Sequence, residues 1–132
     1  MSAPLDVRIY YEDTDCGGVV YYGKYLTYLE RARTEFLEQR GIVLTTLMQD
    51  GLQFVVVHVD IRYHSPARYA DVISIHSEIE DVSFASIVFK HRILRKNTDV
   101  LIAASKVKLA CVGRSLKPER LSSELLARLS EK

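Results

Sequence analysis

Three carboxylates stand within four positions near the start of the chain, Glu12, Asp13 and Asp15, and Gly17 and Gly18 follow them. A carboxylate at the edge of an apolar pocket can attack a carbonyl carbon or activate a water molecule. Backbone N–H groups at the start of a helix can stabilise the negative charge that develops on the carbonyl oxygen. The segment therefore predicts an active site in which a carboxylate acts as nucleophile or base and backbone N–H groups bind the oxyanion. The glycines would let a substrate approach the main chain closely.

The same segment also fits a purely structural role. A loop between a strand and a helix is commonly polar, and an aspartate can cap a turn with its side chain. Spacing alone leaves both interpretations open, because short motifs of this kind also arise by chance. Cys16 is disfavoured as a nucleophile, because a reactive thiol needs a cationic neighbour to lower its pKa and Cys16 follows the acidic Asp15.

The composition is that of an ordinary globular protein. The 132 residues are enough for one domain, 1–132, with 48% hydrophobic and 27% charged residues. The net charge of +1 gives no reason to expect a nucleic-acid partner, and no apolar run is long enough to insert in a membrane. Residues 1–5 do not resemble a signal peptide, so a cytoplasmic location is expected. No Cys/His spacing typical of a metal site is present, and no metal is predicted.

Two periodicities divide the chain. From Tyr22 to Arg40 apolar side chains recur every three or four positions, which predicts an amphipathic helix of about five turns that ends at Gly41. Alternation of apolar and polar residues predicts a strand over residues 5–11. Four longer strands are expected at residues 55–64, 73–80, 86–93 and 101–111, with a short helical turn at 44–50 and a last helix at 118–130 that has Pro118 in its first turn.

The apolar faces of these elements define a predicted core. Arg33 interrupts the apolar face of the long helix, so either its stem lies along the core edge with the guanidinium in water, or it pairs with a carboxylate such as Glu30. Cys111 and His91 fall on apolar strand faces and are expected to pack in the core. The helix residues predicted to face the core are Tyr22, Tyr25, Leu26, Leu29, Ala32, Phe36 and Leu37, and those of the first long strand are Val55, Val57, Val59, Ile61 and Tyr63.

The order of elements predicts the architecture. Short connections between successive strands favour antiparallel neighbours. One face of the resulting sheet needs an apolar cover, and the single long helix carries a matching stripe. We therefore expect an α+β protein in which a five-stranded antiparallel sheet wraps around a long central helix.

Residues 8–22 read Arg-Ile-Tyr-Tyr-Glu-Asp-Thr-Asp-Cys-Gly-Gly-Val-Val-Tyr-Tyr, and a Tyr-His-Ser-Pro-Ala-Arg run follows at residues 63–68. Both closely resemble the hot-dog acyl-CoA thioesterases, in the YbgC branch of the 4-hydroxybenzoyl-CoA thioesterase family. The resemblance runs from about Asp6 to Arg120. It implies a hot-dog fold, hydrolysis of an acyl-CoA with acyl carrier protein as an alternative carrier, and no cofactor. It also implies a homo-oligomer, a dimer or a tetramer built from two dimers, with sites formed between protomers.

The resemblance also implies roles for single residues. Asp15 matches the catalytic carboxylate, acting as nucleophile or general base, and the backbone N–H of Tyr22 would polarise the thioester carbonyl. The residues expected to contact substrate are Gly17, Gly18, Val19, Tyr25, Arg68 and Lys90.

Two departures from the family pattern bear on the activity. Tyr22 stands where YbgC-type enzymes usually carry histidine, so a side-chain role of an imidazole is lost. The run at residues 83–86 is uncharged where benzoyl-specific enzymes bind CoA phosphates through basic residues, so phosphate contacts are expected from Arg68, Lys90 or Arg92. A non-hydrolytic binding module for acyl-CoA or acyl carrier protein is therefore the alternative. A hot-dog dehydratase is disfavoured, because residues 10–25 contain no histidine.

Overall fold

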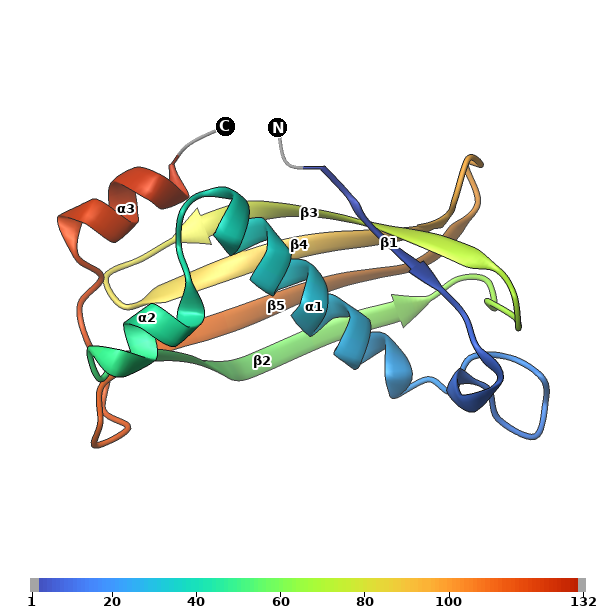
Figure 1. Ribbon diagram of the computed structural model, residues 1–132, viewed down its shortest axis with the longest axis horizontal. Helices are drawn as coiled ribbons and strands as arrows, with labels where there is room; N and C mark the ends of the chain where they lie inside the picture. The colour runs from blue at the N-terminus through green and yellow to red at the C-terminus, as the bar shows by residue number, and fades with distance from the viewer. Residues whose placement is uncertain (1–2, 131–132) are drawn as a thin grey trace.

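The computed structural model describes residues 3–130, and a curved antiparallel sheet surrounds one long helix in it (Figure 1). The strand order is β1-β3-β4-β5-β2, and every neighbouring pair is antiparallel. The predicted α+β architecture with five strands is therefore confirmed. The strands are β1 (Leu5–Arg8), β2 (Gln53–Tyr63), β3 (Val72–Val82), β4 (Ser86–Arg95) and β5 (Leu101–Val112).

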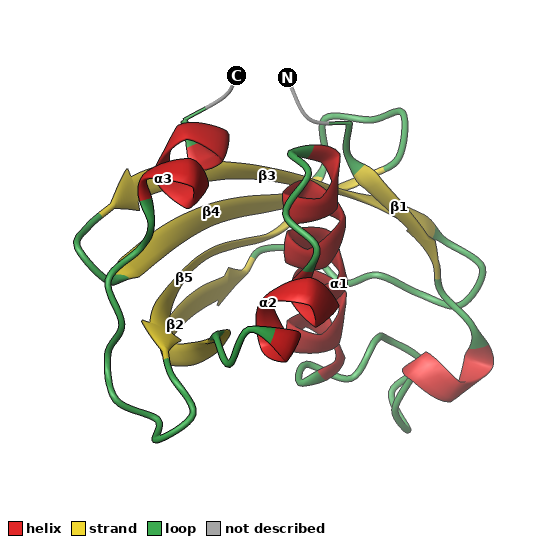
Figure 2. Ribbon diagram, turned by 60° about the vertical axis from the view of Figure 1, so that its left-hand side comes forward, coloured by secondary structure: helices red, strands yellow, loops and turns green. Residues whose placement is uncertain are grey.

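The helices gather on the concave face and at one end of the sheet (Figure 2). The longest helix, α1 (Lys24–Gln39), crosses the concave face, and Gly41 ends it with a φ of 74° as predicted. The others are a 3₁₀ turn, η1 (Tyr11–Asp13), and the helices α2 (Leu44–Gln49) and α3 (Ser123–Leu129). Within residues 3–130, none of the helices has the length and apolarity needed to cross a membrane.

The core lies between α1 and the sheet. The rings of Phe36 and Phe89 meet edge to face at 5.2 Å between centroids, and Leu29 is fully buried beside them. The predicted helix face is wrong at Leu26, which is 43% exposed, and at Tyr22, which precedes α1 and is 64% exposed. It is also wrong in omitting Tyr28, which is buried. The sheet covers the stripe that contains Tyr28, whereas Leu26 faces the edge of the sheet at β2.

The inward side of β2 also differs from strict alternation. Val56 pairs with Leu109, but the next pair is His58 with Lys108, so Val57 is an extra residue in the strand. Such a bulge moves all later side chains to the other face relative to those before it. The predicted alternation is therefore wrong for Val55 and Val57. From Val59 onward the predicted residues share the inner side of the strand, but Val59 and Tyr63 are 37% and 46% exposed and are not core residues. A bulge depends on pairing between strands, which one strand's pattern does not reveal.

Several elements begin or end at other residues than predicted. The first strand ends at Arg8, where η1 follows, and α1 begins at Lys24 rather than Tyr22. The last helix begins at Ser123 because the Ser122 hydroxyl caps it, accepting the Leu125 N–H at 3.1 Å. Pro118 is not in this helix but pairs with Val112 as an isolated bridge.

The two polar or sulfur-containing residues predicted for the core are both buried. The Cys111 side chain is 1% exposed, and burial raises the pKa of its thiol. His91 is also 1% exposed, and its Nδ1 lies 2.8 Å from the Ser77 hydroxyl. Burial, with a smaller effect of the Arg33 charge, lowers the pKa of His91 to about 3, so the ring is neutral in the folded protein near pH 7.

Candidate active site

The acid-rich segment forms a small hairpin beside the start of α1, and residues 64–71 lie next to it (Figure 1). Thr14 pairs with Val20, and the Asp15 N–H donates to the Val19 carbonyl at 2.9 Å. The turn is closed by the Gly18 N–H, which donates to the Asp15 carbonyl at 3.0 Å. Asp15 therefore occupies the end of this hairpin, directly opposite Val19.

Asp13 has a structural role. Its side chain is buried, it accepts the Tyr10 N–H at 2.8 Å, and it forms an ion pair with Lys24 at 3.2 Å. A buried carboxylate with both partners present is stable in that position and has little freedom to meet a substrate. Asp13 therefore joins the 3₁₀ turn to the first residue of α1.

Asp15 is different, because its carboxylate is exposed. One oxygen, Oδ1, accepts the Gly17 N–H at 2.8 Å. A Cβ atom at position 17 would lie 3.2 Å from that same oxygen, so the close approach depends on glycine. Gly18 adopts a φ of 78°, in the left-handed region that favours glycine. The two glycines thus shape the turn, and the Asp15 carboxylate remains accessible.

A cavity of about 290 Å³ opens where α1 begins. Its walls are mostly apolar and aromatic, which suits an acyl group better than a charged one. Asp15 is not one of the lining residues, but its hairpin partner Val19 is. The lining consists of Val19, Val20, Tyr22, Tyr25, Tyr63, His64, Ser65 and Pro66.

Three tyrosines organise this cavity. The Tyr63 hydroxyl donates to the Tyr22 carbonyl at 3.0 Å, and the Tyr63 ring lies 5.5 Å from that of Tyr25. Burial raises the pKa of both Tyr25 and Tyr63, so these hydroxyls keep their protons at neutral pH. Tyr63 thereby fixes the orientation of the peptide group that follows Tyr22.

The backbone at the start of α1 offers unused donors. The Lys24 N–H donates to the Tyr21 carbonyl at 2.9 Å. Neither the Tyr22 N–H nor the Gly23 N–H donates to an acceptor anywhere in residues 3–130. The first amides of a helix carry a partial positive charge and bind anionic or carbonyl oxygens.

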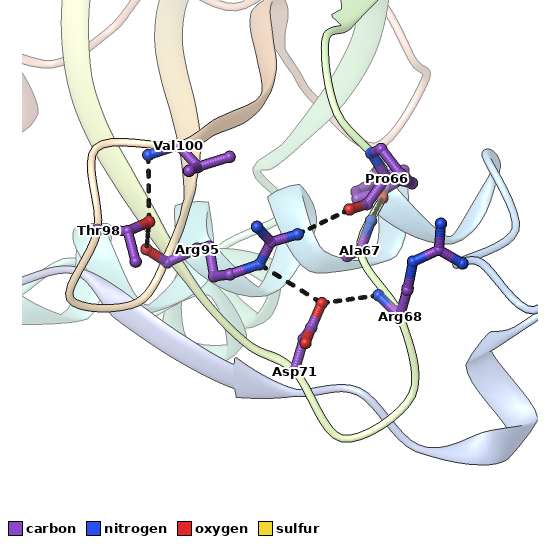
Figure 3. Close-up of polar contacts among 8 residues, drawn as sticks. Pro66, Ala67, Arg68, Asp71, Arg95, Thr98 and Val100 are labelled. Carbon is purple, nitrogen blue, oxygen red and sulfur yellow. Dashed lines mark hydrogen bonds and ion pairs between the residues drawn. The ribbon is translucent and has the colours of Figure 1, made fainter.

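The predicted phosphate-binding residues lie far apart in the fold. Arg68 pairs through its backbone with Val19, and its guanidinium points away from Asp71 and Arg95 (Figure 3). Arg68 is therefore next to the cavity. Lys90 follows the buried Phe89 in β4, so its side chain lies on the outer face of the sheet, opposite to α1.

Sequence reasoning missed the contribution of residues 63–66. Tyr63 was expected only to face the core, and His64, Ser65 and Pro66 were not assigned to the site. The Tyr-His-Ser-Pro-Ala-Arg run was itself a signal, because it carried part of the family resemblance. Its contact with Tyr22 spans 41 positions and depends on the end of β2 reaching the start of α1.

A second cavity, of about 420 Å³, lies in the groove between α1 and β2. Leu26, Val56 and Val59 contribute apolar walls that are exposed to solvent. Arg33 also lines this groove, yet it is only 8% exposed, and burial lowers its pKa. Because Arg33 is buried, the prediction that its guanidinium lies in water is wrong. The charge of Glu30, in the same groove, partly opposes the lowering of the Arg33 pKa, but the two side chains do not form a direct ion pair.

Comparison with known proteins places this fold and site in a family. The sequence pattern of the thioesterase-like superfamily matches residues 10–129. The acyl-CoA thioesterase YbgC of Haemophilus influenzae is 41% identical over 123 residues, which cover 92% of this chain and 89% of the relative. The acyl-CoA thioester hydrolase YbgC of Escherichia coli O6:H1 is 37% identical over 126 residues, covering 95% and 93%.

A solved structure supports the same assignment. The probable thioesterase from Bartonella henselae superposes with a TM-score of 0.83 at 33% identity, covering 90% of this chain and 98% of that one. Family pattern, curated relatives and structural neighbour agree over nearly the whole chain, including the Asp15 hairpin and the start of α1. The chain therefore belongs to the thioesterase-like superfamily and is a hot-dog thioester hydrolase of its YbgC branch.

Proposed function

We propose that the protein hydrolyses an acyl-CoA thioester to a free acid and CoA at the cavity where α1 begins. One observation carries this proposal. The Tyr22 and Gly23 amides have no acceptor within residues 3–130, and Tyr22 lines the cavity together with Val19, the hairpin partner of the exposed Asp15. An electron-poor carbonyl needs both an oxyanion donor and a base or nucleophile, and these are the two groups present.

In the proposed reaction, the thioester oxygen accepts the Tyr22 N–H, which polarises the carbonyl. Asp15 then either attacks the carbonyl carbon or removes a proton from an attacking water. The tetrahedral intermediate collapses, the carbon–sulfur bond breaks, and CoA leaves as a thiolate. Direct attack gives a mixed anhydride on Asp15 that water hydrolyses, whereas base catalysis gives the acid from the tetrahedral intermediate without a covalent acyl-enzyme.

The Tyr22 side chain does not replace the histidine usual in YbgC-type enzymes. A tyrosine hydroxyl donates a hydrogen bond but does not accept a proton at neutral pH. The ring of Tyr22 is also 64% exposed, so it contributes little to enclosing the acyl group in one chain. The proposal therefore assigns proton transfer to Asp15 and carbonyl polarisation to the backbone.

We further propose that two copies of the chain pair along the groove between α1 and β2. Strand β2 pairs only with β5, so one edge of this 11-residue strand lacks a neighbour among residues 3–130. Leu26 and Val56 beside it are 43% and 49% exposed. Long apolar edges are normally covered. A second copy, in a dimer or a dimer of dimers, would also complete the surroundings of Asp15, which does not line the cavity of its own chain.

The carrier of the acyl group contacts the rim of the cavity in this proposal. Arg68 lies beside Val19 with its guanidinium free to turn outward, which suits a CoA phosphate or the phosphopantetheine of an acyl carrier protein. Lys90, on the outer face of the sheet, could contact CoA only beyond the sheet edge or in another copy. Arg68 is therefore the preferred phosphate contact.

The test is a hydrolysis screen against short, long and aromatic acyl-CoAs, with release of free thiol as the measurement. We expect turnover of at least one class, and Asp15→Asn should lower kcat by about 1,000-fold while leaving the circular dichroism spectrum unchanged. Equal rates for Asp15→Asn and the unmodified protein would refute the assignment. Tight calorimetric binding of an acyl-CoA that is never hydrolysed would instead support the binding-module alternative.

A further inference from the structure

Arg95, the last residue of β4, connects two points of the loop that follows β2 (Figure 3). Its Nη2 donates to the Pro66 carbonyl at 3.0 Å, and its Nε lies 3.6 Å from Oδ2 of Asp71. Figure 3 shows the guanidinium between these two acceptors. We refer to Arg95 and Asp71 together as the clamp.

Asp71 extends the clamp into the loop. Its Oδ2 also accepts the Arg68 N–H at 2.9 Å, and its own N–H donates to the Arg68 carbonyl at 3.0 Å. Between them Ala70 has a φ of 72°, a left-handed conformation that is unfavourable for a residue with a side chain. The clamp thus holds a turn that the local sequence would not adopt by preference.

The clamped loop supports the catalytic hairpin. The Ala67 carbonyl accepts the Val20 N–H at 2.8 Å, and Arg68 pairs with Val19 as an isolated bridge. The Ala67 N–H donates to the Tyr25 hydroxyl at 3.4 Å, which ties the same loop to the first turn of α1. Val19 and Val20 form the strand of the hairpin that faces Asp15.

Neither clamp residue lines the 290 Å³ cavity, although Pro66 does. Both are only partly exposed, Arg95 at 35% and Asp71 at 27% of the side chain. Ion pairs of this kind add little to global stability. The main effect of the clamp is therefore local: it places residues 66–68 and the hairpin residues Val19 and Val20 that pair with them.

We propose that Arg95 and Asp71 are positioning residues for hydrolysis: they fix residues 66–68, and through Val19 and Val20 they fix the Asp15 carboxylate relative to the start of α1. The inference rests on the proposed function of Asp15. Arginine suits this position because its planar guanidinium presents Nη2 to the Pro66 carbonyl and Nε to Asp71 Oδ2 at the same time. The single ammonium of a lysine does not reproduce this two-point geometry. Small misplacement of a reacting group is costly, on the order of 100-fold per 1 Å.

The first experiment compares Arg95→Met with Lys96→Met. Lys96 is the matched control, since it is the next residue, has the same charge and forms an ion pair with Asp6 at 2.9 Å that does not involve the loop. We expect kcat to fall about 10-fold in Arg95→Met and less than about 2-fold in Lys96→Met, with similar small changes in Tm. Arg95→Lys should recover part of the loss. Equal kcat values in Arg95→Met and Lys96→Met would overturn the inference.

The second experiment asks whether the clamp acts through Asp15. Single-turnover rates are measured for Arg95→Met, Asp15→Asn and the double variant. If Arg95 only places Asp15, the double variant should be as slow as Asp15→Asn alone, because the group being placed is already inactive. A further fall of about 10-fold in the double variant would show an independent effect and contradict the inference. Full activity of Asp15→Asn would instead refute the proposed function of Asp15. The comparison of Arg95→Met with Lys96→Met does not involve Asp15→Asn, so failure of the inference and failure of the proposed function are distinguishable.

Discussion

The two flanks of α1 are built in opposite ways. On the flank toward β1, the buried Asp13 finds its partners within the chain: it accepts the Tyr10 N–H at 2.8 Å and pairs with Lys24 at 3.2 Å. On the flank toward β2, apolar side chains such as Leu26 are exposed, and Arg33 lies in the groove without an ion-pair partner in the described residues. The Asp13 carboxylate on one flank is satisfied by the chain itself, and the other flank has apolar surface that the described residues leave exposed.

This difference supports the proposed location of the active site. Surface that a chain leaves apolar and unpaired is where a second copy or a substrate gains most by binding. The cavity with Tyr22 and Tyr63 lies on the incomplete flank. The contrast extends to residues two positions apart, because Asp13 belongs to the satisfied flank whereas Asp15 extends from it on an exposed hairpin.

The largest expected effect on stability tests the satisfied flank. Asp13→Asn keeps an acceptor for the Tyr10 N–H but removes the charge that pairs with Lys24. Asp13 is buried but Lys24 is 31% exposed, so removing the Asp13 charge should lower the free energy of unfolding by about 2 kcal/mol in urea titrations. The kcat of the folded fraction should stay within about 3-fold of the unmodified value, since Asp13 takes no part in the proposed chemistry.

Asp15→Asn is the matched comparison, because it makes the same chemical change two positions away. It should leave the free energy of unfolding within about 0.5 kcal/mol, as expected for an exposed side chain, while nearly abolishing turnover. If Asp13→Asn lost activity and kept its stability, the roles of the two carboxylates would have to be exchanged.

The next effect in size tests the incomplete flank. Val56→Asp places a charge on the 49% exposed side chain beside the unpaired edge of β2. If two copies meet there, the dissociation constant measured by sedimentation equilibrium should rise by roughly 50-fold, and activity should fall as monomer accumulates. Phe84→Asp is the control, as Phe84 is 68% exposed in the β3–β4 connection and does not line the groove. Unchanged assembly of Val56→Asp would mean that this groove is not the contact.

The sequence predicted well what depends on local patterns. Periodicity identified α1 and its end at Gly41, because these features depend on a few consecutive residues. The role of Asp15, which the motif suggested, stays a prediction. Prediction from the sequence failed where pairing between distant segments decides the outcome. The bulge at Val57 arises from the register with β5, and the clamp of Arg95 with Asp71 joins the end of one strand to a loop that precedes another.

The smallest expected effect concerns the hydrogen bond from the Tyr63 hydroxyl to the Tyr22 carbonyl. Tyr63→Phe keeps the ring contacts with Tyr25 but removes the hydroxyl that donates to the Tyr22 carbonyl at 3.0 Å. The peptide that carries the Gly23 N–H then loses one restraint, so kcat should fall about 5-fold with little change in KM. Tyr11→Phe, at a 79% exposed ring, should leave kcat unchanged.

The size of that change distinguishes two roles for Tyr63. A hydroxyl that only orients the backbone affects the transition state weakly, because the Tyr22 amide itself remains in place. A hydroxyl that donated directly to the thioester oxygen would be worth about 100-fold or more when removed. An effect of that size would move the oxyanion site from the start of α1 to the end of β2. No effect at all would mean that the Tyr22–Gly23 peptide is held by α1 alone.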